Sequence, residues 1–273
     1  MNLPYLVYSH SEYSDVLRIS AEFLRNNTDK ILLIDACEAT AQTDFTELGF
    51  NKVLFYDDNL PYAKKLADAL AGLNLDYVLF THEIDIALSR DESVLDKLVD
   101  WMKVNNVDRV ELQMNGSGGN TGNYTKISPE KNVSEWAEIT KENLTTTDQY
   151  LQEHSVPGTY RYNVNPSIWK LSSFKELLHA LHYKTYRQIE SEETEDFCKK
   201  YKIYSLHSEA PLSCGYFKCA PLYKFFHITH WREFVKHNDT LTTRYGQSYS
   251  DAAQEYKGII ERHNLLQGKR TFA

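Results

Sequence analysis

The sequence has few cysteines, no long apolar run and no excess of basic residues. Its four cysteines are scattered without a Cys-x-x-Cys pair, which excludes a disulfide framework or a cysteine-rich zinc site and indicates reduced thiols. No apolar stretch approaches the ~20 residues of a membrane-spanning helix. The formal net charge is −8, whereas nucleic-acid binding requires a basic footprint. Membrane insertion and nucleic-acid binding are therefore not expected.

The first residues also lack the charged segment and long apolar segment of a secretory signal peptide. Together with the reduced cysteines, this predicts a cytoplasmic protein. A chain of 273 residues can bury a sizeable core, either as one large domain or as two small ones.

Apolar residues recur in the first 115 residues at spacings that alternate between strand and helix. Strands are expected at residues 5–8, 30–35, 52–56, 76–80 and 108–114, and helices near residues 16–24, 61–73 and 91–102. This order of elements predicts an α/β layered unit with a largely parallel sheet.

The second half of the chain is less regular. Strands are expected at residues 160–164 and 202–206, a helix at 172–181 and an amphipathic helix within 238–273. The glycine-rich stretch 116–122 lacks the Lys-Ser/Thr of a phosphate-binding loop and is interpreted as a connecting loop.

The most informative stretch runs from Asp76 to Asp85, where β-forming residues lead into Glu83-Ile84-Asp85. Residues i and i+2 of an extended segment share a face, so the two carboxylates are expected to point the same way. Adjacent carboxylates repel each other unless a cation lies between them. Oxygen ligands suit Mn²⁺ or Mg²⁺, which can also bind phosphate oxygens. The same spacing also occurs where a strand simply ends in solvated acids.

Polar residues also follow the first and third predicted strands. Ser9, His10 and Ser11 come after the first strand, and Asp57 and Asp58 come after the third. Ligands of such sheets bind beyond the carboxyl ends of the parallel strands. These polar clusters and the Glu83/Asp85 pair are therefore expected to converge on one edge.

Together with residues 163–170 (Asn-Val-Asn-Pro-Ser-Ile-Trp-Lys) and Glu190, these segments resemble the nucleotide-sugar glycosyltransferases of the GT-A type. The resemblance is to small soluble enzymes of large algal viruses and bacterial polysaccharide clusters. In that family the central strand ends in a DxD-like motif, and a Pro-x-Ile-Trp segment precedes an aromatic-x-x-Glu. Glu83 replaces the usual first Asp, and residues 186–190 read Tyr-Arg-Gln-Ile-Glu in place of Trp-x-x-Glu.

The resemblance implies a single α/β domain of the GT-A (Rossmann-like) type, with a mostly parallel central sheet and a smaller acceptor-side subregion. Residues 1–115 would form the half that binds the nucleotide-sugar, and residues 116–235 the half that binds the acceptor and carries the catalytic residue. Residues 236–273 would form a C-terminal helix and tail.

The resemblance also implies which residues bind the donor. Ser9, His10 and Ser11 would hold the nucleoside. Asp57 or Asp58 would contact the base or ribose, and Tyr62 and Lys65 would contact the base and phosphate.

Metal and acceptor roles follow in the same way. Asp85, helped by Glu83, would hold Mn²⁺ (or Mg²⁺) on the diphosphate, and His227 or His230 would complete the metal shell. Asn165 and Trp169 would face the acceptor sugar. The carboxylate beside the acceptor hydroxyl would be Glu190, with Glu192 or Glu193 in reserve.

The implied function is metal-dependent transfer of a sugar from a nucleotide diphosphate to a hydroxyl of a glycan acceptor. The expected donor is a UDP-sugar, for instance of xylose or rhamnose, and the metal would stabilise the leaving diphosphate. Glu190 would act as general base in an inverting reaction and would only orient the acceptor in a retaining one. The residues leave both courses open.

Two other classes of protein remain as alternatives. Another nucleotide-dependent transferase, such as a nucleotidylyltransferase, would carry glycine and basic residues in the first loop, which Ser9-His10-Ser11-Glu12 lacks. A non-catalytic carbohydrate-binding module would bind glycans without nucleotide.

Overall fold

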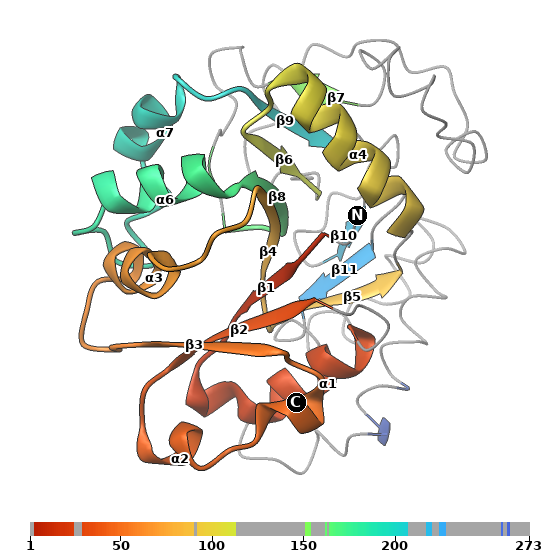
Figure 1. Cartoon of the computed structure of the whole chain (residues 1–273), viewed down its shortest axis with the longest axis vertical. Helices are drawn as coiled ribbons and strands as arrows, with labels where there is room; N and C mark the ends of the chain where they lie inside the picture. The colour runs from red at the N-terminus through yellow and green to blue at the C-terminus, as the bar shows by residue number, and fades with distance from the viewer. Residues whose placement is uncertain are drawn as a thin grey trace, which may run out of the picture.

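The computed structural model describes residues 3–24, 29–89, 92–112, 151–153, 162, 164–206, 217–219, 224–227, 258 and 261–262. In these residues, an eight-stranded sheet lies between two layers of helices, and a three-stranded sheet stands beside it (Figure 1). This arrangement confirms the predicted α/β class. No helix within these ranges is long and apolar enough to cross a membrane.

One side of the large sheet consists of four parallel strands in the order β3-β2-β1-β4. Their bounds are β1 (Tyr5–Tyr8), β2 (Lys30–Asp35), β3 (Lys52–Tyr56) and β4 (Tyr77–His82). All four predicted strands are thus confirmed, with β4 running two residues further than expected. Because the strands are parallel, their carboxyl ends meet at one edge.

The sheet continues from β4 through strands of the second half, in the order β8-β6-β9-β7. Their bounds are β6 (Arg109–Glu111), β7 (Leu151–Glu153), β8 (Ser167–Lys170) and β9 (Ile203–Leu206). β8 is antiparallel to both β4 and β6, β6 is parallel to β9, and β7 is antiparallel to β9. The start of β8 and the end of β6 therefore lie at the same edge as the end of β4.

The strand expected at residues 160–164 is wrong at its two described positions, and positions 160, 161 and 163 lie outside the described residues. Tyr162 and Val164 lie outside any strand, and pairing begins only at Ser167. Pro166 has no N–H to donate to a neighbouring strand. Regular pairing of β8 therefore starts after this residue.

The small sheet has the order β10-β11-β5 and is antiparallel, with β5 (Asp85–Ser89), β10 (Phe217–Cys219) and β11 (Lys224–His227). The prediction that Glu83 and Asp85 extend one strand is therefore wrong. β4 ends at His82, Glu83 and Ile84 form a turn, and Asp85 opens β5 in the other sheet.

Helices cover both faces of the large sheet (Figure 1). One face is covered by α1 (Ser14–Phe23) and α4 (Glu92–Asn105), and the other by α3 (Tyr62–Leu70), α6 (Leu171–Ala180) and α7 (Glu192–Cys198). Shorter turns are α2 (Glu38–Ala41) and the 3-10 helices η1 (Ser11–Tyr13) and η2 (Phe45–Leu48). The helices predicted near 16–24, 61–73, 91–102 and 172–181 are confirmed as α1, α3, α4 and α6. Of the predicted C-terminal helix, positions 258, 261 and 262 are described and are helical.

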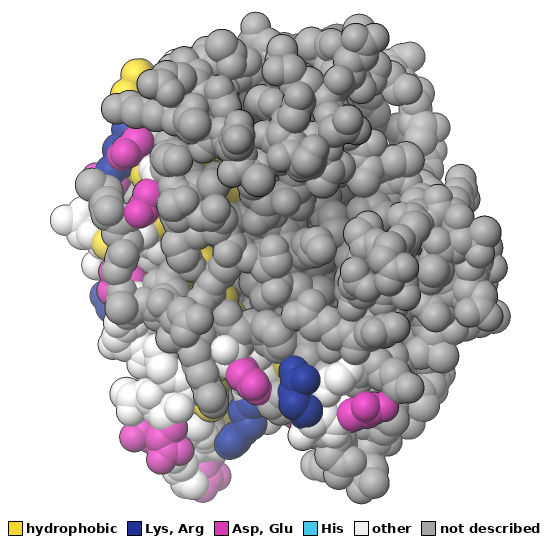
Figure 2. Space-filling model, turned by 90° about the vertical axis from the view of Figure 1, so that its right-hand side faces the viewer, with side chains coloured by type: hydrophobic (Ala, Val, Ile, Leu, Met, Phe, Trp, Pro, Cys, Tyr) yellow, Lys and Arg dark blue, Asp and Glu magenta, His cyan; other side chains and the backbone are white. Residues whose placement is uncertain are grey.

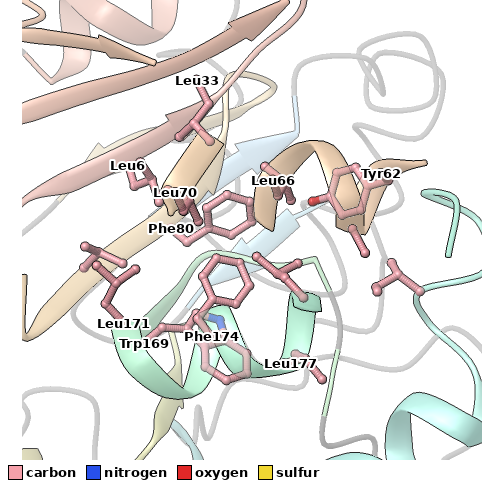
Figure 3. Packing of buried hydrophobic residues seen from close by; sticks show 14 of the residues in the cluster. Leu6, Leu33, Tyr62, Leu66, Leu70, Phe80, Trp169, Leu171, Phe174 and Leu177 are labelled. Carbon is pink, nitrogen blue, oxygen red and sulfur yellow. The ribbon is translucent and has the colours of Figure 1, made fainter. Parts of the chain in front are cut away.

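Alternate residues of the central strands fill the two halves of the core, as expected for extended chains. Tyr5 and Val7 of β1 pack on the side of α1 and α4, while Leu6 packs on the side of α3 and α6. Figure 3 shows this second half, in which Phe80 of β4 meets Phe174 of α6. A core on both faces holds the carboxyl ends of the strands in fixed positions.

Charged side chains of both signs occupy the described part of the face in Figure 2, with Lys and Arg beside Asp and Glu along its lower edge. Alternating signs produce only a weak long-range field. This part of the surface therefore offers no single-sign attraction for a charged polymer.

Gly49 closes η2 with a left-handed backbone (φ 80°). A Cβ at this position would lie 3.1 Å from the buried Lys30 Nζ. A left-handed conformation costs a residue with a Cβ roughly 1–2 kcal/mol. We therefore expect Gly49→Ala to lower the free energy of unfolding by about that amount in a urea titration. Gly72→Ala is the control, because a Cβ there meets nothing within 4 Å, and an equal loss in both variants would contradict the assignment.

Candidate functional site

A pocket of about 440 Å³ opens at the carboxyl edge of the parallel strands. Its walls come from the turn after β1, the start of α3, the end of β4 and the segment after α6. Lining residues from these four elements include His10, Lys65, Glu83 and Tyr186. The predicted convergence of polar groups at this edge is thus confirmed for the turns after β1 and β4.

Asp58 links two basic side chains at this pocket. Lys65 Nζ donates a hydrogen bond to Asp58 Oδ1 at 2.7 Å, and His10 Nε2 lies 3.0 Å from Asp58 Oδ2. Partial burial by itself would raise the pKa of Asp58, but the hydrogen bonds from Lys65 and His10 lower it. Asp58 therefore stays ionised and orients both partners.

Lys65 is the best-placed cation of the pocket. It is buried, and its ammonium lies 4.6 Å from the ring centre of Tyr56 and 5.6 Å from that of Tyr8. Burial by itself would lower the pKa of Lys65, but its hydrogen bonds to Asp58 and Tyr8 raise it. The side chain therefore remains charged, and aromatic faces stabilise that charge.

The two acids after β3 have different surroundings. Asp57 accepts hydrogen bonds from Asn59 N at 3.0 Å and Asn59 Nδ2 at 2.9 Å, which is a local turn. Asp57 and Asp58 are both exposed and neither lines the pocket, but Asp58 is bonded to two side chains that do, Lys65 and His10. Asp58 is therefore the acid of the pair that the fold brings to the pocket.

Ser9 and Ser11 shape the turn after β1 from below. Ser9 is fully buried, and its carbonyl oxygen accepts a hydrogen bond from Tyr56 Oη at 2.6 Å. Ser11 donates through its N–H and its hydroxyl to the two carboxylate oxygens of Asp35, at 2.6 and 2.7 Å. These contacts fix His10, which of the three predicted residues Ser9, His10 and Ser11 is the one that lines the pocket.

Sequence reasoning missed Asp35, although it ends a buried strand and the rule about carboxyl ends applies to it. His82 was missed as well. Its Nε2 lies 3.0 Å from the hydroxyl oxygen of Tyr62, and its ring centre lies 5.0 Å from that of Tyr8. Tyr62 is buried, which raises the pKa of its hydroxyl. Tyr62 and His82 therefore form a closed floor of the pocket.

The two predicted metal ligands are both buried, with Glu83 at 5% and Asp85 at 6% exposure. Glu83 lines the pocket, and its N–H donates to Tyr8 O at 3.0 Å. His227 of β11 is the direct backbone partner of Asp85 of β5. Carboxylate oxygens are ligands that suit Mn²⁺ or Mg²⁺.

No three His, Cys, Asp or Glu side chains within the described ranges are close enough together to hold a metal ion by themselves. His230, the other predicted histidine ligand, lies outside those ranges.

The carboxylates predicted for the acceptor side differ in their contacts. Glu190 is exposed, and its Oε1 accepts a hydrogen bond from Val164 N at 2.8 Å. Glu193 accepts from the hydroxyl of Tyr183 and pairs with Lys184 at 2.5 Å. Glu192 is exposed in the first turn of α7. Of the three, Glu190 is the one whose charge acts on pocket residues Tyr62 and Tyr186.

The interpretation of Trp169 as a residue that faces the acceptor is wrong. Its side chain is 1% exposed and stacks on Phe174, with ring centres 5.0 Å apart (Figure 3). Asn165 is also buried, and its Nδ2 donates to Glu111 Oε1 at 2.7 Å. Trp169 in β8 and Asn165, two residues before β8, therefore belong to the protein interior.

Comparisons with known proteins give only distant likenesses. No family model and no curated protein matches the chain. A cytidylyltransferase from Leptospira borgpetersenii is 12% identical with a TM-score of 0.48 over 99% of this chain and 98% of that one. Residues 1–349 of TarS from S. aureus are 12% identical with a TM-score of 0.45, over 86% and 63%. An active-site mutant of LgtC is 10% identical with a TM-score of 0.42, over 74% and 72%. Likenesses this distant carry no weight for function, which is argued below from the residues of the site.

Proposed function

We propose that this protein is a nucleotide-dependent transferase, and specifically a metal-dependent glycosyltransferase that uses a nucleotide-sugar donor. The observation that carries the proposal is that a buried cation, Lys65, and a buried carboxylate, Glu83, line one pocket, while the buried Asp85 acts through its charge on the pocket residue Tyr186. A basic side chain and a carboxylate-bound divalent metal are both groups that bind diphosphate oxygens.

The residues divide the proposed site into three regions. Lys65 and His10, oriented by Asp58, would bind the nucleotide at the ends of β1 and β3. Glu83 and Asp85, with His227 or His230, would hold Mn²⁺ (or Mg²⁺). The bound metal would supply Lewis-acid stabilisation of the leaving diphosphate.

Glu190 is proposed to act on the acceptor hydroxyl. The hydrogen bond from Val164 N fixes one oxygen of its exposed carboxylate. A carboxylate held in this way can receive a proton at its other oxygen if the reaction inverts. The expected donor is a UDP-sugar, such as one of xylose or rhamnose, and the acceptor is a glycan hydroxyl.

A thermal-shift experiment tests the donor site. Wild type, Asp85→Ala and the control Asp57→Ala are measured with UDP, GDP or CMP, each with and without Mn²⁺. A ligand at 100 times its Kd stabilises the folded state by roughly 2.7 kcal/mol, which raises the Tm by several degrees. We expect one nucleotide to produce this shift in wild type and Asp57→Ala, with Mn²⁺ required.

Each other outcome has a definite meaning. A shift that persists without Mn²⁺ and in Asp85→Ala would remove the metal from the proposal. The absence of any shift in the wild type would overturn the transferase assignment, and binding to glycans would then be measured instead.

A further inference from the structure

Tyr186 differs from the other aromatic residues of the pocket in its exposure. It lines the pocket and is 45% exposed. Tyr62 and His82 are buried, and the half-buried Tyr8 stacks on Tyr56 with ring centres 5.3 Å apart and an interplanar angle of 12°. Among the aromatic side chains that the structure places around the pocket, Tyr186 is therefore the exposed one.

The position of the Tyr186 ring is fixed from below. Its centre lies 5.2 Å from that of Tyr62 at 82°, in an edge-on contact, and 5.7 Å from that of His82. Edge-on aromatic pairs at this distance attract each other. The ring is thus supported by the pocket floor and remains accessible from the solvent side.

The backbone that carries Tyr186 is also held on both sides. Lys184 O accepts a hydrogen bond from Ala63 N of α3 at 3.1 Å. Thr185 N and Oγ1 donate to Gln188 Oε1 at 3.1 and 3.0 Å, and Ile189 is fully buried. This segment is therefore a preformed wall of the pocket.

Tyr186 shares the pocket lining with Glu83, and the charges of the proposed metal ligands and the proposed base act on its hydroxyl. The charges that act most on its hydroxyl are those of Asp85, Glu190 and Glu83. Burial of the hydroxyl, followed by these carboxylates, raises the pKa of Tyr186, so the phenol stays protonated. In a nucleotide-sugar the sugar is bonded directly to the terminal phosphate. Glu83 and Tyr186 line the same pocket, so the sugar of a donor whose diphosphate binds near Glu83 would lie in the pocket that this ring lines.

We propose that Tyr186 is the platform on which the sugar ring of the nucleotide-sugar donor rests. The inference depends on the proposed function and deepens it, because it assigns the residue that recognises the sugar as distinct from the nucleotide. Pyranose rings present C–H groups on their faces, which suit an exposed aromatic face. The edge of the phenol can in addition donate a hydrogen bond to a sugar hydroxyl.

Binding measurements on matched ligands test the proposal. The Kd values of UDP, UDP-glucose and UDP-xylose are measured with Mn²⁺ by calorimetry for wild type, Tyr186→Ala, Tyr186→Phe and Tyr183→Ala. Tyr183 is the matched control, since it is 48% exposed and three residues away, but its hydroxyl bonds Glu193 and it does not line the pocket.

Tyr186→Ala should leave the Kd of UDP within about two-fold and raise the Kd of the better-binding UDP-sugar by roughly ten-fold relative to UDP. Tyr186→Phe keeps the aromatic face and should therefore retain most of the wild-type difference between the Kd values of the UDP-sugar and UDP. Tyr183→Ala should behave as wild type.

Two results would overturn the inference while leaving the proposed function intact. Equal weakening of UDP and UDP-sugar by Tyr186→Ala would place the ring against the nucleotide, and unchanged binding of both would remove it from the donor site. Failure of the wild type to bind UDP and either UDP-sugar would instead count against the UDP-sugar donor, and against this inference with it.

Discussion

Trp169→Ala is expected to lower the free energy of unfolding by about 3–5 kcal/mol, the range found when a large buried aromatic residue is truncated. The indole is 1% exposed and stacks on Phe174 at an interplanar angle of 19°. The guanidinium of Arg109, itself fully buried, lies 5.1 Å from its ring centre. Truncation would leave a cavity and also remove a cation–π contact from a buried charge.

Two further variants make this result interpretable. Trp169→Phe retains an aromatic ring and should lower the free energy of unfolding by less than Trp169→Ala. Its free energy of unfolding can therefore be measured even if the alanine variant does not fold. Trp101→Ala is a second control, because Trp101 is only half-buried and packs edge-on against Tyr204. Urea titrations of the three variants give the comparison. If Trp169→Ala had an unchanged midpoint and only weakened acceptor binding, the assignment to the core would be incorrect.

The parallel strands of the first half could be predicted because each is a short apolar run with a clear end. In a sheet covered on both faces, such runs have few alternatives. Val78, Leu79 and Phe80 are all buried, as the pattern predicted. The rule that ligands bind at carboxyl ends then located the pocket correctly.

The second half of the sheet could not be predicted in the same way. β8 inserts antiparallel between β4 and β6, although about 85 residues separate β4 from β8 in the chain. Local spacing contains no information on such a pairing. The role expected for Trp169 failed for this reason, since an aromatic residue after a proline looks the same in a loop and in a core strand.

A local rule fails at Glu83 and Asp85, and the metal site expected from it stays a prediction. The alternation of an extended strand does not apply, because the chain turns between the two residues and Asp85 enters a second sheet. Both carboxylates are nevertheless buried next to the pocket. Only the pairing of β5 with β11 brings His227 into register with Asp85, and residues so far apart in sequence give no local signal.

His82 was missed, whereas Tyr186 was noted only as the first residue of the segment that replaces Trp-x-x-Glu and was given no role. His82 continues an apolar run and was interpreted only as part of its approach to the acids, although the carboxyl-end rule covers it. Tyr186 lies in a polar segment whose importance depends on the hydrogen bond between Ala63 and Lys184, which joins two halves of the chain. The sequence also could not show which of the adjacent acids Asp57 and Asp58 contacts the pocket residues. That depends on the folded positions of Lys65 and His10, which bond to Asp58.

Lys65→Met is expected to weaken nucleotide binding by roughly 10- to 150-fold, which corresponds to the loss of about 1.5–3 kcal/mol from a hydrogen bond between charged groups. Lys65 is the buried cation that lines the pocket, and the hydrogen bond to Asp58 aims it. Methionine retains most of the apolar stem that packs near Tyr56 and Tyr8. The fold should therefore be preserved while the charge is lost.

The adjacent residue provides the matched control. Lys64 is on the same helix, its side chain is 41% exposed, and its ammonium pairs with Asp68 one turn away at 2.9 Å. An exposed pair of this kind contributes at most a few tenths of a kcal/mol, so Lys64→Met should bind nucleotide as wild type does. Both variants lose one positive charge, and a general electrostatic effect would therefore weaken them equally. Calorimetric titration with UDP and Mn²⁺ distinguishes the two cases: equal Kd values for Lys64→Met and Lys65→Met would show that Lys65 does not contact the phosphates. A selective loss in Lys65→Met would place the diphosphate between this ammonium and the carboxylates of Glu83 and Asp85.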